Sequence, residues 1–133
     1  MRRLPKQTPP RVRAAILRTW LNGWCTGARF GQRRGTCRLG CPSARDDLRH
    51  YVCCPVLWRF GVDELRVQDP ATPEGRTAKA LLWDTASSKE ELVREARLIA
   101  TGYRAHCKLR HTPSAELVHI DIQRLLKELS RSC

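Results

Sequence analysis

The first 45 residues contain no aspartate or glutamate, although they carry eleven arginine and lysine residues. From residue 61 onward, twelve basic residues are nearly balanced by eleven acidic ones. The net charge of +12 is therefore concentrated in the N-terminal third of the chain. Such a charge repels itself in the compact state and favours an anionic partner. We expect this partner to be nucleic acid (RNA or DNA), rather than an anionic membrane surface or an acidic protein.

Long apolar runs are also missing from the chain. No stretch approaches the roughly 18 apolar residues of a membrane-spanning helix, so no membrane partner is expected. The apolar stretch AAILRTWL is short and contains Arg18, unlike the apolar centre of a secretory signal. We therefore expect an intracellular protein, nuclear or cytoplasmic. A mitochondrial transit peptide is the alternative, but such peptides are rich in serine and residues 1–45 contain only Ser43.

Motifs typical of enzymes are absent as well. The sequence has no Gly-x-Gly-x-x-Gly loop and no Gly-Lys-Ser phosphate-binding loop. We expect neither an enzyme nor a small-molecule substrate. Aromatic residues make up only 6% of the chain, and half of them are tryptophan. With 133 residues, 41% of them hydrophobic, the chain is long enough for one modest core.

What the sequence does have is a concentration of cysteine. Four of its seven cysteines lie between residues 37 and 54, in CRLGCPSARDDLRHYVCC. The odd count and the lack of a secretory signal argue against a disulfide framework. Gly35, Gly40 and Pro42 indicate a tight turn around the first two cysteines. Ser43 is expected to cap a helix that runs from Ala44 to about residue 53.

This segment predicts a structural zinc site. A turn would present two thiolates, and the helix would present an imidazole and a third thiolate, as a tetrahedral zinc ion requires. The expected ligands are Cys37, Cys41, His50 and Cys54. Cys53 remains an alternative to Cys54, which is preferred because i and i+4 residues share one side of a helix. Four protein ligands leave no open position for water, which favours a structural role over a catalytic one.

Other interpretations of the cysteine and histidine residues are weaker. Cysteines are often small buried hydrophobic residues, but this segment has few large apolar residues to surround them. A nucleophilic Cys–His pair would need His50 and Cys54 free of metal, and no third group orients them. His106, Cys107 and His111 form a second ligand-like group, which lacks a second cysteine pair and is expected to be structural.

A longer stretch around these residues resembles a known family. Residues 22–58, NGWCTGARFGQRRGTCRLGCPSARDDLRHYVCCPVLW, resemble the Cys-Cys-His-Cys region that follows the polymerase domain in LINE-type, non-LTR retrotransposon reverse transcriptases. The helix in residues 102–111, GYRAHCKLRH, is similar to one that follows in some of these proteins. The resemblance implies nucleic-acid binding and positioning during target-primed reverse transcription. It does not imply polymerase activity, because the Tyr-x-Asp-Asp signature has no counterpart here.

The rest of the pattern predicts a mostly α-helical domain with the zinc-knuckle-like turn and helix inserted in it. We expect a basic segment and first helix in residues 1–30, the Cys-Cys-His-Cys module in 31–60, a linker with a short helix in 61–86, and a C-terminal helical pair in 87–133. The expected helices within these segments span about residues 10–24, 77–84 and 88–108. Thr112 is expected to cap a last helix that begins at Pro113 and has Val118 in its apolar stripe. Ser87 and Glu90 are expected to cap the long helix.

The basic residues near the turn are the expected nucleic-acid contacts. Arg29, Arg33, Arg34 and Arg38 would be held near the metal-bound turn. Arg11, Arg13 and Arg18 would line the polar face of the first helix, whose Trp20 and Trp24 are expected in the core. Charged contacts of this kind bind phosphates with low sequence specificity.

Overall fold

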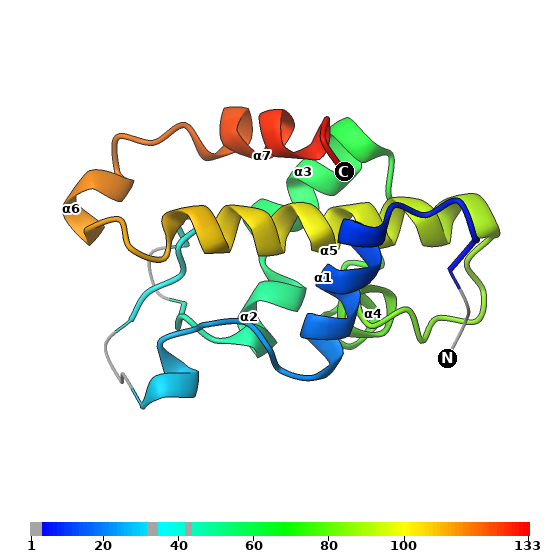
Figure 1. Ribbon diagram of the computed structural model, residues 1–133, viewed down its shortest axis with the longest axis horizontal. Coiled ribbons are helices and arrows are strands. Elements are labelled where there is room, and N and C mark those ends of the chain that lie inside the picture. The colour runs from blue at the N-terminus through cyan, green and yellow to red at the C-terminus, as the bar shows by residue number, and fades with distance from the viewer. Residues whose placement is uncertain (1–3, 32–34, 42–43) are drawn as a thin grey trace.

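The protein folds as a set of α-helices around one long central helix (Figure 1). The structure is a computed structural model that describes residues 4–31, 35–41 and 44–133. The helices are α1 (Pro10–Trp20), the 3₁₀ helix η1 (Ala28–Phe30), α2 (Leu48–Cys53), α3 (Pro55–Leu65), α4 (Pro73–Ala80), α5 (Lys89–Leu109), α6 (Ser114–Leu117) and α7 (Ile122–Ser130). Within the described ranges, extended pairing is limited to one antiparallel bridge between Thr36 and Arg45. The predicted mostly α fold class is confirmed.

Helix α5 is the element on which the others pack. Helices α1, α3, α4 and α7 all contact it, and Figure 1 shows α3 and α7 on one side of it with α2 and α4 on the other. Its buried residues include Leu92, Ala96, Leu98, Ile99 and Ala105. One hydrophobic cluster runs from Val12 through the cysteine segment to Leu126, so the four expected segments share a single core.

The ends of the predicted helices differ from the structure in ways that capping explains. Helix α5 begins one residue later than expected, because Ser88, not Ser87, accepts a hydrogen bond from the Glu91 backbone N–H. Ser87 instead donates to the buried carboxylate of Glu95, which also holds Lys79 at 2.8 Å. The last helix begins at Ser114, because Pro113 and not Thr112 is at the N-cap, and it is interrupted because Asp121 caps α7 as a new start. Val118, expected in the apolar stripe, is therefore 78% exposed.

The first helix is shorter than expected, but both of its expected tryptophans still contact the rest of the fold. Helix α1 ends at residue 20 instead of 24. Trp24 is completely buried and donates from Nε1 to the hydroxyl of Thr19. Trp20 is half-buried and donates to the Leu81 carbonyl, which ties α1 to the end of α4. The expected core position is thus confirmed for Trp24 and only partly reached by Trp20.

Helix α3 is not among the helices expected from the sequence, which divides its residues between the Cys-Cys-His-Cys module in 31–60 and the linker in 61–86. It begins with Pro55 at its first position and ends at Arg66 in a left-handed conformation. It crosses α5 closely because each helix has a glycine at the crossing. A Cβ atom on Gly61 would lie 2.8 Å from Leu98, and one on Gly102 would lie 2.7 Å from Leu57.

We expect Gly102→Val to lower the free energy of unfolding by about 1–3 kcal/mol, because the added methyl groups must push α3 away. Lys108→Val on the exposed side of α5 is the control, since it adds a β-branched residue to the same helix without a clash and should cost only about 0.5 kcal/mol. Urea unfolding measures both. An equal loss in the two variants would contradict the close crossing of α3 and α5.

No helix among the described residues has the length and apolar character to cross a membrane.

Candidate metal centre

A tight turn presents the first two cysteines of the cluster. The bridge between Thr36 and Arg45 closes its base, and the Cys37 N–H donates to the Ala44 carbonyl at 2.9 Å. Gly40 has φ +91°, a left-handed conformation that glycine adopts without strain, and its N–H donates to the Cys37 carbonyl. Pro42 and Ser43 lie outside the described residues.

The histidine and the third cysteine come from α2 and its C-terminal end. The expected start of this helix at Ala44 is wrong, because Arg45 is drawn into the bridge and the helix begins only at Leu48. Asp47 is its N-cap and accepts from the His50 N–H at 2.6 Å. Its expected end is confirmed, since Cys54 precedes Pro55 and leaves the helical conformation.

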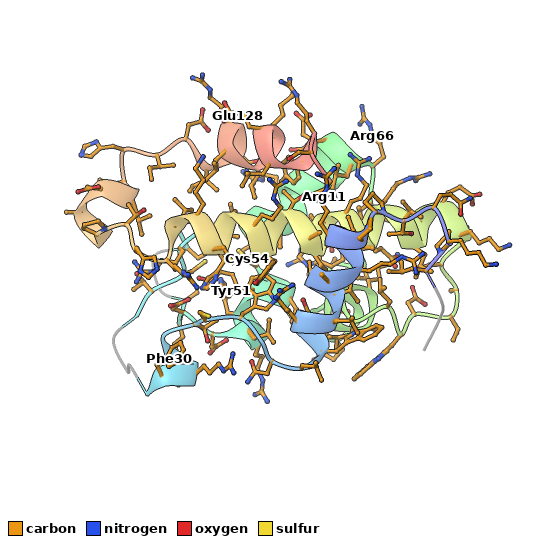
Figure 2. All side chains as sticks on the ribbon, in the orientation of Figure 1. Arg11, Phe30, Tyr51, Cys54, Arg66 and Glu128 are labelled. Atoms are coloured by element: carbon orange, nitrogen blue, oxygen red, sulfur yellow. The ribbon has the colours of Figure 1, made fainter. Side chains whose placement is uncertain are left out.

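The ligand atoms of the four predicted residues gather in one place. Cys37, Cys41, His50 and Cys54 each offer one atom, and all four atoms lie within 4.8 Å of one another. The Cys54 sulfur is 3.5 Å from that of Cys41 and 4.0 Å from that of Cys37. The three cysteines are buried, and Figure 2 shows Cys54 beneath α5 beside Tyr51. Three sulfurs and one imidazole form a donor set for a metal cation.

The surroundings of His50 and Cys53 indicate which of them is available to a metal ion. The Nε2 atom of His50 is buried and has no hydrogen-bond partner among the described residues, as expected for an atom kept for a metal. Cys53, the alternative ligand, faces away from the cluster. Its sulfur lies 3.3 Å from the Pro73 carbonyl and 3.2 Å from the Thr77 hydroxyl, on α4.

Close contact among the three cysteines moves their pKa values apart. The Cys54 thiol, opposed by burial and helped by His50, lowers the pKa of Cys37 from 9.0 to about 4. Burial and then the charge of Cys37 raise the pKa of Cys41. The hydrogen bond to Cys37 and then burial raise the pKa of Cys54 far above its usual value. Three thiolates this close together therefore require a positive ion between them.

Backbone amides also point at the sulfur atoms. The Leu39 N–H donates to the Cys37 sulfur at 3.4 Å. Burial and the contact with Cys37 raise the pKa of Cys41 and of Cys54, and the N–H groups of Val56 and Leu57 at the start of α3 offset a small part of this rise. The N-terminus of this 11-residue helix thus opposes the rise in pKa without reversing it.

A buried polar network fixes the turn against α5, and the sequence analysis did not find it. The Asp46 carboxylate accepts from the Tyr51 hydroxyl at 2.7 Å and from the Gly27 N–H at 2.7 Å. It lies 3.5 Å from Nε2 of His106, a completely buried residue of α5. The Tyr51 hydroxyl in turn accepts from the Arg38 N–H, inside the cysteine turn. Only folding brings these groups together, because Asp46 and His106 are 60 positions apart.

The second ligand-like group does not assemble. His106 is occupied by Asp46 and by ring contacts with Trp24 and Tyr51, whereas His111 is exposed on the loop after α5. Within the described part of the chain, the cluster of three cysteines and His50 is the only metal-ligand grouping. All seven cysteines are free, so no disulfide is formed.

The predicted nucleic-acid residues fall into three groups. Arg11, Arg18 and Arg29 are exposed, and Arg29 lies over the ring of Phe30, which is 64% exposed at the edge of η1 (Figure 2). Arg13 and Arg38 use their guanidinium groups within the fold. Arg13 donates to the carbonyls of residues 5, 6 and 8, and Arg38 donates to the Thr112 carbonyl. Arg33 and Arg34 lie outside the described residues.

Comparisons with known proteins give no identity. No protein-family model matches the chain, and no curated protein or solved structure matches it significantly. The resemblance to the tail of LINE-type reverse transcriptases therefore stays a prediction.

Proposed function

We propose that the cluster binds one structural zinc ion. A tetrahedral zinc site with Zn–S bonds of about 2.3 Å separates its sulfur ligands by about 3.8 Å. The sulfur of Cys54 lies 3.5 Å from that of Cys41 and 4.0 Å from that of Cys37, and these separations fall on either side of this value. Cys37, Cys41, His50 and Cys54 would fill all four positions, and the ion would supply the charge that lets all three thiols ionise. With no position left for water or substrate, its role is to hold the turn, α2 and the start of α3 together.

We further propose that the zinc-stabilised domain binds nucleic acid through phosphate contacts of low sequence specificity. The observation that supports this is unbalanced charge. Of the basic residues before Asp46 that the structure describes, none forms an ion pair, whereas the ion pairs of lysine and arginine all lie between residues 64 and 128. The exposed members of this basic group are Lys6, Arg11, Arg18, Arg29 and Arg45. Their charge remains available to a polyanion.

The salt dependence of binding tests this proposal. About five phosphate contacts should give a plot of log K against log salt with a slope of about −3.5 to −4.5, depending on strand number. The triple variant Arg11→Gln, Arg18→Gln, Arg29→Gln should reduce the magnitude of this slope by about 2–3. The loss should be similar for unrelated sequences, since phosphate contacts carry no sequence information. Fluorescence anisotropy with labelled oligonucleotides measures both quantities.

Arg124→Gln is the matched control, because Arg124 is exposed but already paired with Glu128 at 3.2 Å. It should leave the slope unchanged. Absence of binding to both RNA and DNA at low salt, or a triple variant that binds as well as the parent, would contradict the proposal.

A protein-interaction module is the second candidate, and a groove supports it. The groove has a volume of about 1010 Å³ and lies between α1, η1, α2 and α4. Trp20, Leu48, Val52, Leu81 and Trp83 line it, and Trp83 is 59% exposed. Its cations Arg29 and Arg49 are matched in number by Asp47 and Glu74, so it has no excess charge for a polyanion. If the protein is such a module, the zinc ion only stabilises the fold and the protein does not bind nucleic acid.

A further inference from the structure

Cationic side chains gather around a hollow on the side of α5 where α3 and α7 pack. The hollow has a volume of about 490 Å³ and lies where α3 and α7 both end against α5. Five basic residues line it, with Glu64, Leu65 and Ser130: Arg66, Arg94, Arg97, Lys127 and Arg131. We call this the C-terminal basic pocket. None of its residues belongs to the N-terminal basic segment on which the proposed function rests.

Carboxylates balance only part of this charge. Glu64 pairs with Lys127 at 2.9 Å, and Glu91 pairs with Arg94 at 3.3 Å. Arg66, Arg97 and Arg131 have no carboxylate partner in the described parts of the chain. Three uncompensated guanidinium groups around one hollow repel one another, and a bound anion relieves that repulsion.

Two of the four pocket arginines form hydrogen bonds with carbonyl groups at helix ends, and the other two do not. Arg94 donates to the Arg66 carbonyl at the end of α3, and Arg97 donates to the Ser130 carbonyl at the end of α7. These bonds hold both guanidinium groups in place. Arg66 and Arg131 make no side-chain hydrogen bond with any described residue, and Figure 2 shows Arg66 pointing outward from the end of α3.

Arg97, which lines the pocket, also has a buried donor without a partner. The Nε atom of Arg97 is inaccessible to solvent and bonds to no described residue. An unpaired buried donor is costly unless a ligand or ordered water satisfies it. Arginine presents several N–H donors in a rigid plane, which matches the oxygens of a phosphate group.

We propose that the C-terminal basic pocket binds a phosphate group, with Arg66, Arg97 and Arg131 as its main contacts. The group could belong to a free phosphate compound or to the terminal phosphate of a nucleic-acid strand, and the pocket chemistry is the same for both. The site is separate from the proposed phosphate contacts of the first 45 residues. Its failure would therefore leave the proposed function untouched.

Titration calorimetry with inorganic pyrophosphate tests the pocket directly. The variant Arg66→Gln, Arg131→Gln should bind pyrophosphate at least about tenfold more weakly than the parent, since each lost charged hydrogen bond is worth about tenfold or more. The control Lys108→Gln, Arg110→Gln removes the same charge from exposed residues at the other end of α5 and should bind as the parent does. Circular dichroism checks that both variants are folded.

A second arm separates the two sources of phosphate. Oligonucleotides of one sequence are compared with and without a 5′ phosphate. A preference for the phosphorylated strand that the Arg66→Gln, Arg131→Gln variant loses identifies a strand terminus as the ligand. Pyrophosphate binding without that preference identifies a free phosphate compound. If the parent binds neither probe, or if the pocket variant and the control lose affinity equally, the proposal is overturned.

Discussion

Replacing Cys54 with serine should abolish zinc binding and unfold most of the chain, whereas replacing the neighbouring Cys53 should do neither. Structural zinc sites contribute on the order of 10 kcal/mol to folding, and a domain of this size is stable by only about 5–15 kcal/mol. The sulfur of Cys54 belongs to the cluster, and its burial places it in the same hydrophobic core as Trp58 and Ile99. Loss of the metal should therefore disturb α5 as well as the turn.

Cys53→Ser is a closely matched control. It removes a sulfur one position away, and a serine hydroxyl can still bond to the Pro73 carbonyl and to Thr77. Elemental analysis of the purified proteins should find one zinc per chain for the parent and for Cys53→Ser, and none for Cys54→Ser. Circular dichroism should show helical content lost only in Cys54→Ser and in the parent treated with a chelator. Equal zinc content in the two variants would refute the assignment of ligands.

Replacing Asp46 with alanine should cost about 3–5 kcal/mol of unfolding free energy, the range for removing one partner of a buried charged pair. The Asp46 carboxylate is 5% exposed and is the acceptor for Tyr51 and Gly27 beside His106. Its loss leaves two donors and an imidazole buried without a partner. Asp47→Ala, one residue away, removes only a helix cap and should cost about 1 kcal/mol. Urea unfolding at a fixed zinc concentration measures both, and equal costs would contradict the network.

The same network predicts a particular pH dependence. Burial opposes charge on His106, but Asp46 and then Cys107 raise its pKa above 6.5. A raised pKa in the folded state gives stability that is complete below pH 6.5 and is lost as the pH rises through the raised value. Burial likewise opposes the charge on Asp46, yet His106, Tyr51 and the Gly27 N–H lower its pKa below 3.8. That contribution is present above pH 3.8 and is lost as the pH falls through the lowered value.

Asp46→Asn separates this pH dependence from other titrations. Without the carboxylate, the His106 imidazole has lost the group that contributes most to raising its pKa. The loss of stability above pH 6.5 should therefore be smaller in Asp46→Asn than in the parent, as urea unfolding at a series of pH values would show. A parent and variant with the same alkaline profile would assign that dependence to another group.

The clustering of Cys37, Cys41, His50 and Cys54 was predictable because it depends on local geometry. The spacing of the cysteines and the turn residues Gly35 and Gly40 indicated two ligand pairs, and the i to i+4 relation favoured Cys54 over Cys53. These relations involve only a few residues of one segment, so contacts with distant segments change them little. The predicted start of α2 at Ala44 was wrong. The bridge between Thr36 and Arg45 holds Arg45 in an extended conformation, and Asp47 caps the helix in place of Ser43.

The missed features depend on contacts between distant segments or on signals that were overlooked. Pro55 at the first position of α3 is a helix-start signal, but it also lies inside the module expected in residues 31–60. The network around Asp46 could not be found from the sequence. Its partners are Gly27 just before η1, Tyr51 of α2 and His106 of α5, which are far apart in the chain. The structural uses of Arg13 and Arg38 were also hidden, because a charge count does not show which guanidinium groups bond to backbone carbonyls.

X-ray absorption at the zinc edge tests the proposed zinc site without perturbing it. It measures the atoms around the metal in the purified, folded protein, without any variant. A zinc ion bound by three cysteines and one histidine should show a first shell of three sulfur atoms at about 2.3 Å and one nitrogen at about 2.0–2.1 Å. A protein that carries no zinc, or a first shell with fewer sulfurs and an oxygen from water, would contradict the proposed Cys37, Cys41, His50 and Cys54 site.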